Sequence, residues 1–169
     1  RRQPKDKPLF LYVPFNAVHA PHQVPAKYKE PYSGLAEPRR TYAGMVAAMD
    51  EAVGQIVSAV EQAGRRPNTL FVFSSDNGGP NPGRVTDNGP LRAGKGRYYE
   101  GGIRVPLIVR PLRATTAPGR SDEPVISNDF YPTLLEMAGL PLRWAQHVDG
   151  RSFAPLLAGR GVRPRDALY

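Results

Sequence analysis

The sequence predicts an α/β fold with a mostly parallel sheet, and three segments carry this prediction. Two short apolar runs, residues 8–13 and 69–74, contain no charge and are typical of strands buried on both faces. Between them lies one long segment with the periodicity of a helix. A strand, a helix and a strand make a βαβ unit, in which the two strands run parallel.

The bulk composition is that of one ordinary globular domain. The chain has 169 residues, of which 40% are hydrophobic and 22% charged. We see no long apolar run and no signal peptide, and we interpret residues 1–7 as a linker or a cut end. Because the chain has no cysteine, it has no disulfide, no thiolate metal site and no cysteine nucleophile.

The charge balance is basic, with 23 Lys and Arg against 15 Asp and Glu and a formal net charge of +8. Such a balance favours anionic partners. The basic residues are scattered, without the basic face or the interleaved aromatic residues of nucleic-acid binders. A solvated basic surface is therefore a better interpretation than a nucleic-acid site, and we expect no nucleic acid and no membrane as partner.

The first predicted strand, residues 8–13, ends in a polar loop that contains His19 and His22. Prolines at positions 14 and 21 restrict the backbone of this loop. A stiff loop at the end of a strand could hold an imidazole in place, so His19 is a candidate functional residue. For His22 an ordinary surface position is the better interpretation.

The helix between the two strands is predicted by apolar residues spaced three, four and seven apart. Gly64 is suited to end this helix, and Arg65 and Arg66 complement the negative end of its dipole. We interpret the helix as structural, with these positions on its core face: Tyr42, Met45, Val46, Met49, Val53, Ile56, Val57 and Val60.

The second strand runs directly into Asp76, Asn77 and two glycines. In an open α/β sheet, ligands bind beyond the carboxyl ends of the strands. Both side chains offer oxygen, which a hard cation such as calcium prefers. On these four residues alone, an ordinary turn is the favoured interpretation. Parallel strands would place them at the same sheet edge as the His19 loop.

A long irregular region follows at residues 80–102, with six glycines and one lysine, Lys95. Loops of this length are usually functional or disordered. A phosphate-binding loop is not supported, because the spacing of that motif is absent.

The remaining elements are short. We expect strands at 103–109, with Pro106 indicating an irregular or edge position, and at 125–126. Asp129 can cap a helix that runs to Met137 and ends at Gly139. A short helix is expected at 153–157, followed by a basic, irregular tail at 160–169.

Six segments occur in the order seen in type I sulfatases, and the chain resembles that family, especially its arylsulfatase-B-like members, from about residue 8 to residue 159. The segments are Asn-Ala-Val-His-Ala-Pro (16–21), Tyr-Ala-Gly-Met-Val-Ala-Ala-Met-Asp (42–50), Ser-Ser-Asp-Asn-Gly-Gly (74–79), Pro-Leu-Arg-Ala-Gly-Lys (90–95), Tyr-Glu-Gly-Gly-Ile-Arg-Val-Pro (99–106) and Asp-Phe-Tyr-Pro-Thr-Leu-Leu (129–135).

The resemblance implies a three-layer, alkaline-phosphatase-like sandwich with a mostly parallel central sheet, of which residues 8–159 form a part. It implies that Asp76 and Asn77 ligate one calcium ion. It also implies that His19 contacts the sulfate and the leaving-group oxygen, and that Lys95 binds the sulfate. The expected activity is hydrolysis of aryl or carbohydrate sulfate esters, in a periplasmic or secreted protein.

One departure from the family is plain. Relatives carry a Cys- or Ser-x-Pro-x-Arg motif whose first residue becomes the formylglycine nucleophile, and this chain has neither form of it. We therefore expect the nucleophile and the remaining calcium ligands in an N-terminal segment missing from this chain. The fragment alone is expected to be inactive.

Two alternatives remain at this stage. One is a phosphodiesterase or phosphonate hydrolase of the same superfamily, although Asn77 favours a single hard cation over a two-metal site. The other is a non-catalytic remnant that binds sulfated glycans through its basic surface.

Overall fold

The computed structural model describes residues 4, 6–80, 84–110, 119–147 and 149–161, and divides into two compact units. The first unit comprises Arg1–Arg66 and Val72–Ile108, and the second Pro67–Phe71 and Val109–Tyr169. All four predicted site residues, His19, Asp76, Asn77 and Lys95, belong to the first unit. Only one part of the predicted tail, residues 160 and 161, is among the described residues.

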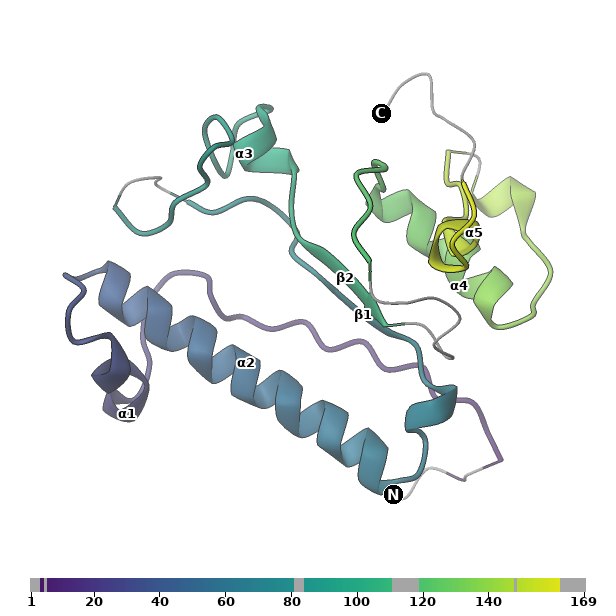
Figure 1. The fold of residues 1–169 in the computed structure, drawn as a ribbon, viewed down its shortest axis with the longest axis horizontal. Helices are drawn as coiled ribbons and strands as arrows, with labels where there is room; N and C mark the ends of the chain where they lie inside the picture. Colours follow the sequence, from purple (N-terminus) through teal and green to yellow (C-terminus); the bar gives the residue numbers. More distant parts are fainter. Residues whose placement is uncertain (1–3, 5, 81–83, 111–118, 148, 162–169) are drawn as a thin grey trace. The chain divides into compact units, whose positions relative to one another are not determined.

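The first unit is built around α2 (Arg39–Gln62), the long helix in Figure 1. Its predicted core face is only partly covered: Met45 is buried, whereas Val46 is 39% exposed. The short helices α1 (Ala26–Lys29) and η1 (Glu30–Tyr32) pack near its N-terminal half. Gly44 allows a close approach there, because a side chain at this position would lie 3.0 Å from the Tyr28 carbonyl oxygen.

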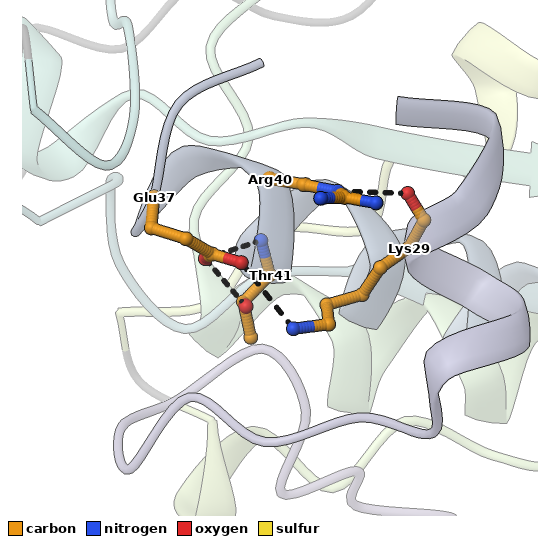
Figure 2. Close-up of polar contacts among 4 residues, drawn as sticks. All are labelled: Lys29, Glu37, Arg40 and Thr41. Carbon is orange, nitrogen blue, oxygen red and sulfur yellow. Dashed lines mark hydrogen bonds and ion pairs between the residues drawn. The ribbon is translucent and has the colours of Figure 1, made fainter. Parts of the chain in front are cut away.

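A cluster of polar contacts joins α1 to the start of α2 (Figure 2). The Glu37 carboxylate accepts hydrogen bonds from the backbone N–H and the hydroxyl of Thr41, at 3.2 and 2.6 Å, and pairs with Lys29 at 3.3 Å. Arg40 Nε donates to the Lys29 carbonyl oxygen at 3.2 Å. The hydrogen bond from Thr41 lowers the pKa of Glu37, with a smaller contribution from Lys29.

The end of α2 confirms the prediction. Gly64 has φ of 68°, the left-handed conformation that ends many helices, and the Arg65 N–H donates to the Val60 carbonyl oxygen at 3.0 Å. The Arg65 guanidinium also donates to the carbonyl oxygens of Pro4 and Lys7, at 2.7 and 3.3 Å. These bonds attach part of the predicted linker to the end of the helix.

By length and composition, α2 is the one helix among the described residues that could cross a membrane, with a mean hydropathy of 1.2 over its most apolar window. Asp50 and Glu51 stand at its middle, and charges there are costly in a bilayer. The pattern is that of an amphipathic helix, which packs with one face.

The sheet differs from the prediction. Two strands, β1 (Phe71–Ser74) and β2 (Leu107–Arg110), lie side by side in Figure 1 and form a two-stranded sheet. They are antiparallel: the Ser74 hydroxyl donates to the Pro106 carbonyl oxygen at 3.2 Å, and Arg110 lies over the Phe71 ring. The chain returns from β1 to β2 through residues 75–106, which contain one short helix, α3 (Glu100–Ile103).

The expected strand at residues 8–13 is absent, and this prediction was wrong. The segment belongs to no strand, and its large side chains are exposed, Phe10 to 79% and Tyr12 to 77%. A continuous apolar run predicts that a segment is buried, but only neighbouring elements can bury it. The expected strand at 103–109 shortens to β2, because Ile103 ends α3, and residues 125–126 form no strand.

The second unit is organised around Asp129, Thr133 and the start of α4 (Phe130–Met137). The Asp129 carboxylate is buried and accepts hydrogen bonds from the backbone N–H groups of Ile126 and Arg151, at 3.0 and 2.8 Å. The buried Thr133 hydroxyl donates to the Asp129 carbonyl oxygen and accepts from the Phe153 N–H. These bonds attach α4 to the segment that leads into α5 (Ala154–Leu157).

Three single-turn helices complete the described elements: η2 (Arg66–Asn68), η3 (Ser127–Asp129) and η4 (Trp144–Gln146). The helix predicted from Asp129 to Met137 is confirmed, and Gly139, with φ of 68°, follows its end. Asp129 precedes the helix as expected, but its side chain does not cap it.

Candidate functional site

Asp76 and Asn77 occupy a turn directly after β1, as predicted. Asp76 is exposed and Asn77 is half-buried. The Ser75 hydroxyl donates to the Asn77 carbonyl oxygen at 2.9 Å, which holds the turn closed. The Gly78 N–H then donates to the Gly102 carbonyl oxygen at 2.9 Å. The two oxygen-bearing side chains therefore stand on a backbone that is fixed at both sides.

The glycine-rich loop is bound to this turn, and it brings Lys95 with it. The Lys95 N–H donates to the Gly79 carbonyl oxygen at 3.1 Å. One side-chain amide reinforces the contact: Asn88 Nδ2 donates to the carbonyl oxygens of Gly79 and Ala93, both at 3.0 Å. The segment that carries a lysine and the turn that carries a carboxylate are thus neighbours in space.

Asn88 supports the candidate site, and the sequence analysis did not identify it. In the sequence it stands in Asp-Asn-Gly, a common turn pattern. In the structure its side chain bonds both the residue after the Asp76 turn and the glycine-rich loop. Nothing in a single sequence distinguishes an asparagine that bonds its own turn from one that reaches across a loop.

Three glycines make the close approach possible. A side chain on Gly78 would collide with the Gly101 carbonyl oxygen, and one on Gly102 would collide with the carbonyl oxygens of Arg97 and Gly94. The Gly101 N–H donates to the Arg92 carbonyl oxygen at 2.8 Å. The glycines that the sequence shows are therefore needed for backbone contact as well as for turning.

The loop is also held from its first half. The Arg39 guanidinium donates to the Val85 carbonyl oxygen at 3.3 Å, and the Thr86 hydroxyl donates to the Pro80 carbonyl oxygen at 2.7 Å. Val85 and Thr86 are both buried. The N-terminal end of α2 thereby supports the loop that carries Lys95.

His19 lies in an exposed loop, and its hydrogen bonds are local. Its backbone N–H donates to the Asn16 carbonyl oxygen at 2.9 Å, and its ring Nδ1 lies 2.8 Å from the Ala20 carbonyl oxygen. An Nδ1 that faces a carbonyl carries the hydrogen, so the neutral ring has its lone pair on Nε2. These contacts do not join His19 to the Asp76 turn, and its placement beside that turn stays a prediction. His22 is half-buried, with its ring edge against Tyr42.

The donor set at the turn fits part of a calcium site. A carboxylate and a side-chain amide oxygen are the ligand types that calcium takes, but calcium needs about six to eight oxygens. Among the described residues, no group of three or more histidines or acids gathers where it could hold a metal. Asp76 and Asn77 could therefore contribute to a site that other ligands complete.

Comparison with known proteins shows which family the sequence matches. The family model described as Sulfatase matches residues 1–140. A sulfatase from Formosa agariphila is 42% identical over 92% of this chain and 31% of that protein. Arylsulfatase A from Homo sapiens is 36% identical over 99% of this chain and 32% of that protein. The mouse arylsulfatase J is 41% identical over 78% of this chain and 22% of that protein.

Solved structures also match. One match is the crystal structure of Ps i-CgsB in complex with k-i-k-neocarrahexaose. The two sequences are 38% identical and the structures superpose with a TM-score of 0.84, over 92% of this chain and 35% of that chain. A second structure of Ps i-CgsB gives a TM-score of 0.77. The chain thus spans about a third or less of the relatives that it matches.

Proposed function

The chain belongs to the sulfatase family, and we propose that the whole protein hydrolyses sulfate esters of aryl or carbohydrate alcohols to the alcohol and inorganic sulfate. The named arylsulfatases among its relatives support this reaction. The contact that most supports it here is the bond from the Lys95 backbone N–H to the Gly79 carbonyl oxygen, because it joins the segment that carries Lys95 to the residues that follow Asp76 and Asn77.

We assign two of the chain's own residues to the substrate. Negative charge develops on the sulfate oxygens and on the departing alcohol as a sulfate ester is cleaved. Lys95 binds the sulfate and stabilises the charge on its oxygens. His19 donates its Nδ1 hydrogen to the Ala20 carbonyl oxygen. Nε2 is therefore the atom that carries a proton to the leaving alcohol.

Asp76 and Asn77 are assigned to one calcium ion, each through a side-chain oxygen. The ion would supply positive charge that stabilises the sulfate oxygens. The nucleophile is assigned to no residue here, because the chain has no cysteine and no Ser-x-Pro-x-Arg motif. We propose that this segment, formylglycine included, and the remaining calcium ligands lie in a part of the protein N-terminal to residues 8–159. Those residues would then complete a three-layer, alkaline-phosphatase-like sandwich.

A sulfated glycan is the substrate class that we favour. One similar structure, Ps i-CgsB, holds an oligosaccharide, and the net charge of +8 suits a polyanion. Because a glycan polymer does not cross membranes, we propose that the protein acts in the periplasm or outside the cell.

Hydrolysis of 4-nitrophenyl sulfate by the whole protein tests the reaction. Lys95→Ala and His19→Ala should each lower kcat/KM roughly 100-fold or more, because each removes a group that acts in the transition state. Lys27→Ala, an exposed lysine on α1, is the matched control and should stay within about twofold. Absence of sulfate release by the wild type from both aryl and carbohydrate sulfates would refute the proposal, as would full activity of Lys95→Ala.

A further inference from the structure

The glycine-rich loop displays more than Lys95. Residues 94–97 form a tight turn, in which the Arg97 N–H donates to the Gly94 carbonyl oxygen at 3.1 Å and Gly96 has φ of 80°. Three large side chains stand on this turn or directly after it, and all are exposed: Lys95, Arg97 and Tyr98. Tyr98 is 97% exposed, more than any other large apolar or aromatic side chain among the described residues.

The neighbouring side chains have structural contacts that explain their positions. The Arg92 guanidinium lies 3.8 Å from the centre of the Tyr99 ring, and the Gly102 N–H donates to the Tyr99 carbonyl oxygen at 2.8 Å. Glu100 pairs with Arg104 at 3.4 Å. The contact between Arg92 and Tyr99 therefore supports the loop, and the Glu100 carboxylate is already engaged one turn away.

Arg97 and Tyr98 have no such explanation. In the part of the chain that the structure describes, neither Lys95 nor Arg97 forms an ion pair. Their Cα atoms lie no more than about 7 Å apart, because only one residue separates them. Two cations at this spacing can hold two anionic groups of one molecule, and guanidinium binds an oxyanion through two parallel hydrogen bonds.

We propose that Arg97 and Tyr98 determine specificity for a glycan that carries more than one anionic group. Arg97 binds a second sulfate or carboxylate next to the sulfate held by Lys95, and Tyr98 packs its ring on the apolar face of a sugar. The rigid backbone under the turn lowers the entropy lost on binding. The placement of the substrate at Lys95 rests on the proposed function.

The test measures binding and turnover separately in the whole protein. Calorimetry follows binding of heparin, chondroitin sulfate and carrageenan hexasaccharides, and 4-nitrophenyl sulfate reports turnover of a substrate with one charge and no sugar. Arg97→Gln and Tyr98→Ala should each weaken binding of the best hexasaccharide roughly tenfold, the loss expected for one charge-assisted contact or one stacked ring. Turnover of 4-nitrophenyl sulfate should change less than about twofold.

Arg66→Gln is the matched control, since Arg66 is exposed but lies beyond the end of α2 and pairs with Glu61. The inference is overturned if the wild type binds none of the three hexasaccharides, if Arg97→Gln binds as tightly as the wild type, or if both variants lose aryl sulfate turnover in proportion. Failure of the reaction itself appears differently, as wild-type protein that binds a hexasaccharide but releases no sulfate. In that case the binding data still decide the roles of Arg97 and Tyr98.

Discussion

At the scale of single residues, the candidate site depends on glycines, whose lack of a side chain lets two backbone segments come close together. Gly78 follows Asn77, and its backbone N–H bonds the Gly102 carbonyl oxygen. A Cβ at Gly78 would occupy the place of the Gly101 carbonyl oxygen. Because backbone atoms cannot move aside as a flexible side chain can, the turn and the loop stay together only with glycine at this position.

Gly78→Ala should therefore separate the Asp76 turn from the Lys95 loop. We expect a loss of stability of about 1–3 kcal/mol from overpacking, together with a loss of aryl sulfatase activity larger than the stability change explains. Thermal unfolding and kcat/KM of the whole protein measure the two effects. Gly54→Ala is the control: a Cβ added to this exposed helical glycine would have no atom within 4 Å, and alanine there should stabilise by up to about 1 kcal/mol. If Gly78→Ala and Gly54→Ala had the same unfolding temperature and the same kcat/KM, glycine would not be required at position 78.

The sequence predicted part of this site and missed the rest for identifiable reasons. The Asp76 turn followed from a strand that ends in polar residues, and the structure places it at the end of β1. Asn88 was missed because its long-range amide contacts have no local signature. Arg92 and Arg97 look alike in the sequence, and only the ring of Tyr99 beside Arg92 tells them apart.

At the scale of secondary-structure elements, the polar cluster at the start of α2 makes the stability of the fold depend on pH through Glu37. The Thr41 hydrogen bond and Lys29 favour the charged form of Glu37 and lower its pKa below the ordinary 4.5. A carboxylate with a lowered folded-state pKa stabilises the fold above its unfolded pKa, and this contribution disappears as the pH falls through the folded pKa.

Glu37→Gln should destabilise the protein at neutral pH and matter less in acid. The difference in unfolding temperature between wild type and variant should shrink as the pH is lowered from 7 to well below 4.5, because protonation of Glu37 removes the same charge that the variant lacks. Glu30→Gln, at an exposed glutamate in η1, serves as the control and should show little change at either pH. A difference that stays constant or grows in acid would show that Glu37 does not act through its charge.

At this scale the strand expected at 69–74 is confirmed as β1, whereas the strand expected at 8–13 is absent. The spacing of apolar residues and Gly64 determine α2 through contacts within a few turns, which a sequence pattern contains. Residues 8–13 have an equally apolar pattern, yet they are exposed and form no strand. A strand needs a hydrogen-bonded neighbour, and the antiparallel return of β2 onto β1 depends on the path of the intervening loop.

At the scale of the whole molecule, the described chain supplies an incomplete set of functional groups. Backbone hydrogen bonds hold the segment that carries Lys95 next to the turn that carries Asp76 and Asn77, and the sequence lacks the Cys- or Ser-x-Pro-x-Arg motif. It also spans about a third or less of its relatives. Two donors cannot satisfy calcium, so a calcium ion at Asp76 and Asn77 would need further oxygen ligands, which we propose come in part from elsewhere in the protein.

The metal content of the whole protein tests this sharing. Elemental analysis should find about one calcium per protein, and removal with EGTA should abolish aryl sulfate turnover until calcium is restored, because oxygen donors suit calcium better than zinc. Asp76→Ala should lower the bound calcium, whereas Asp50→Ala, an exposed acid on α2, should leave it unchanged. Stoichiometric zinc in place of calcium, or full calcium content in Asp76→Ala, would contradict the assignment. Because metal content is measured independently of turnover, the result stands even if another part of the protein limits the reaction.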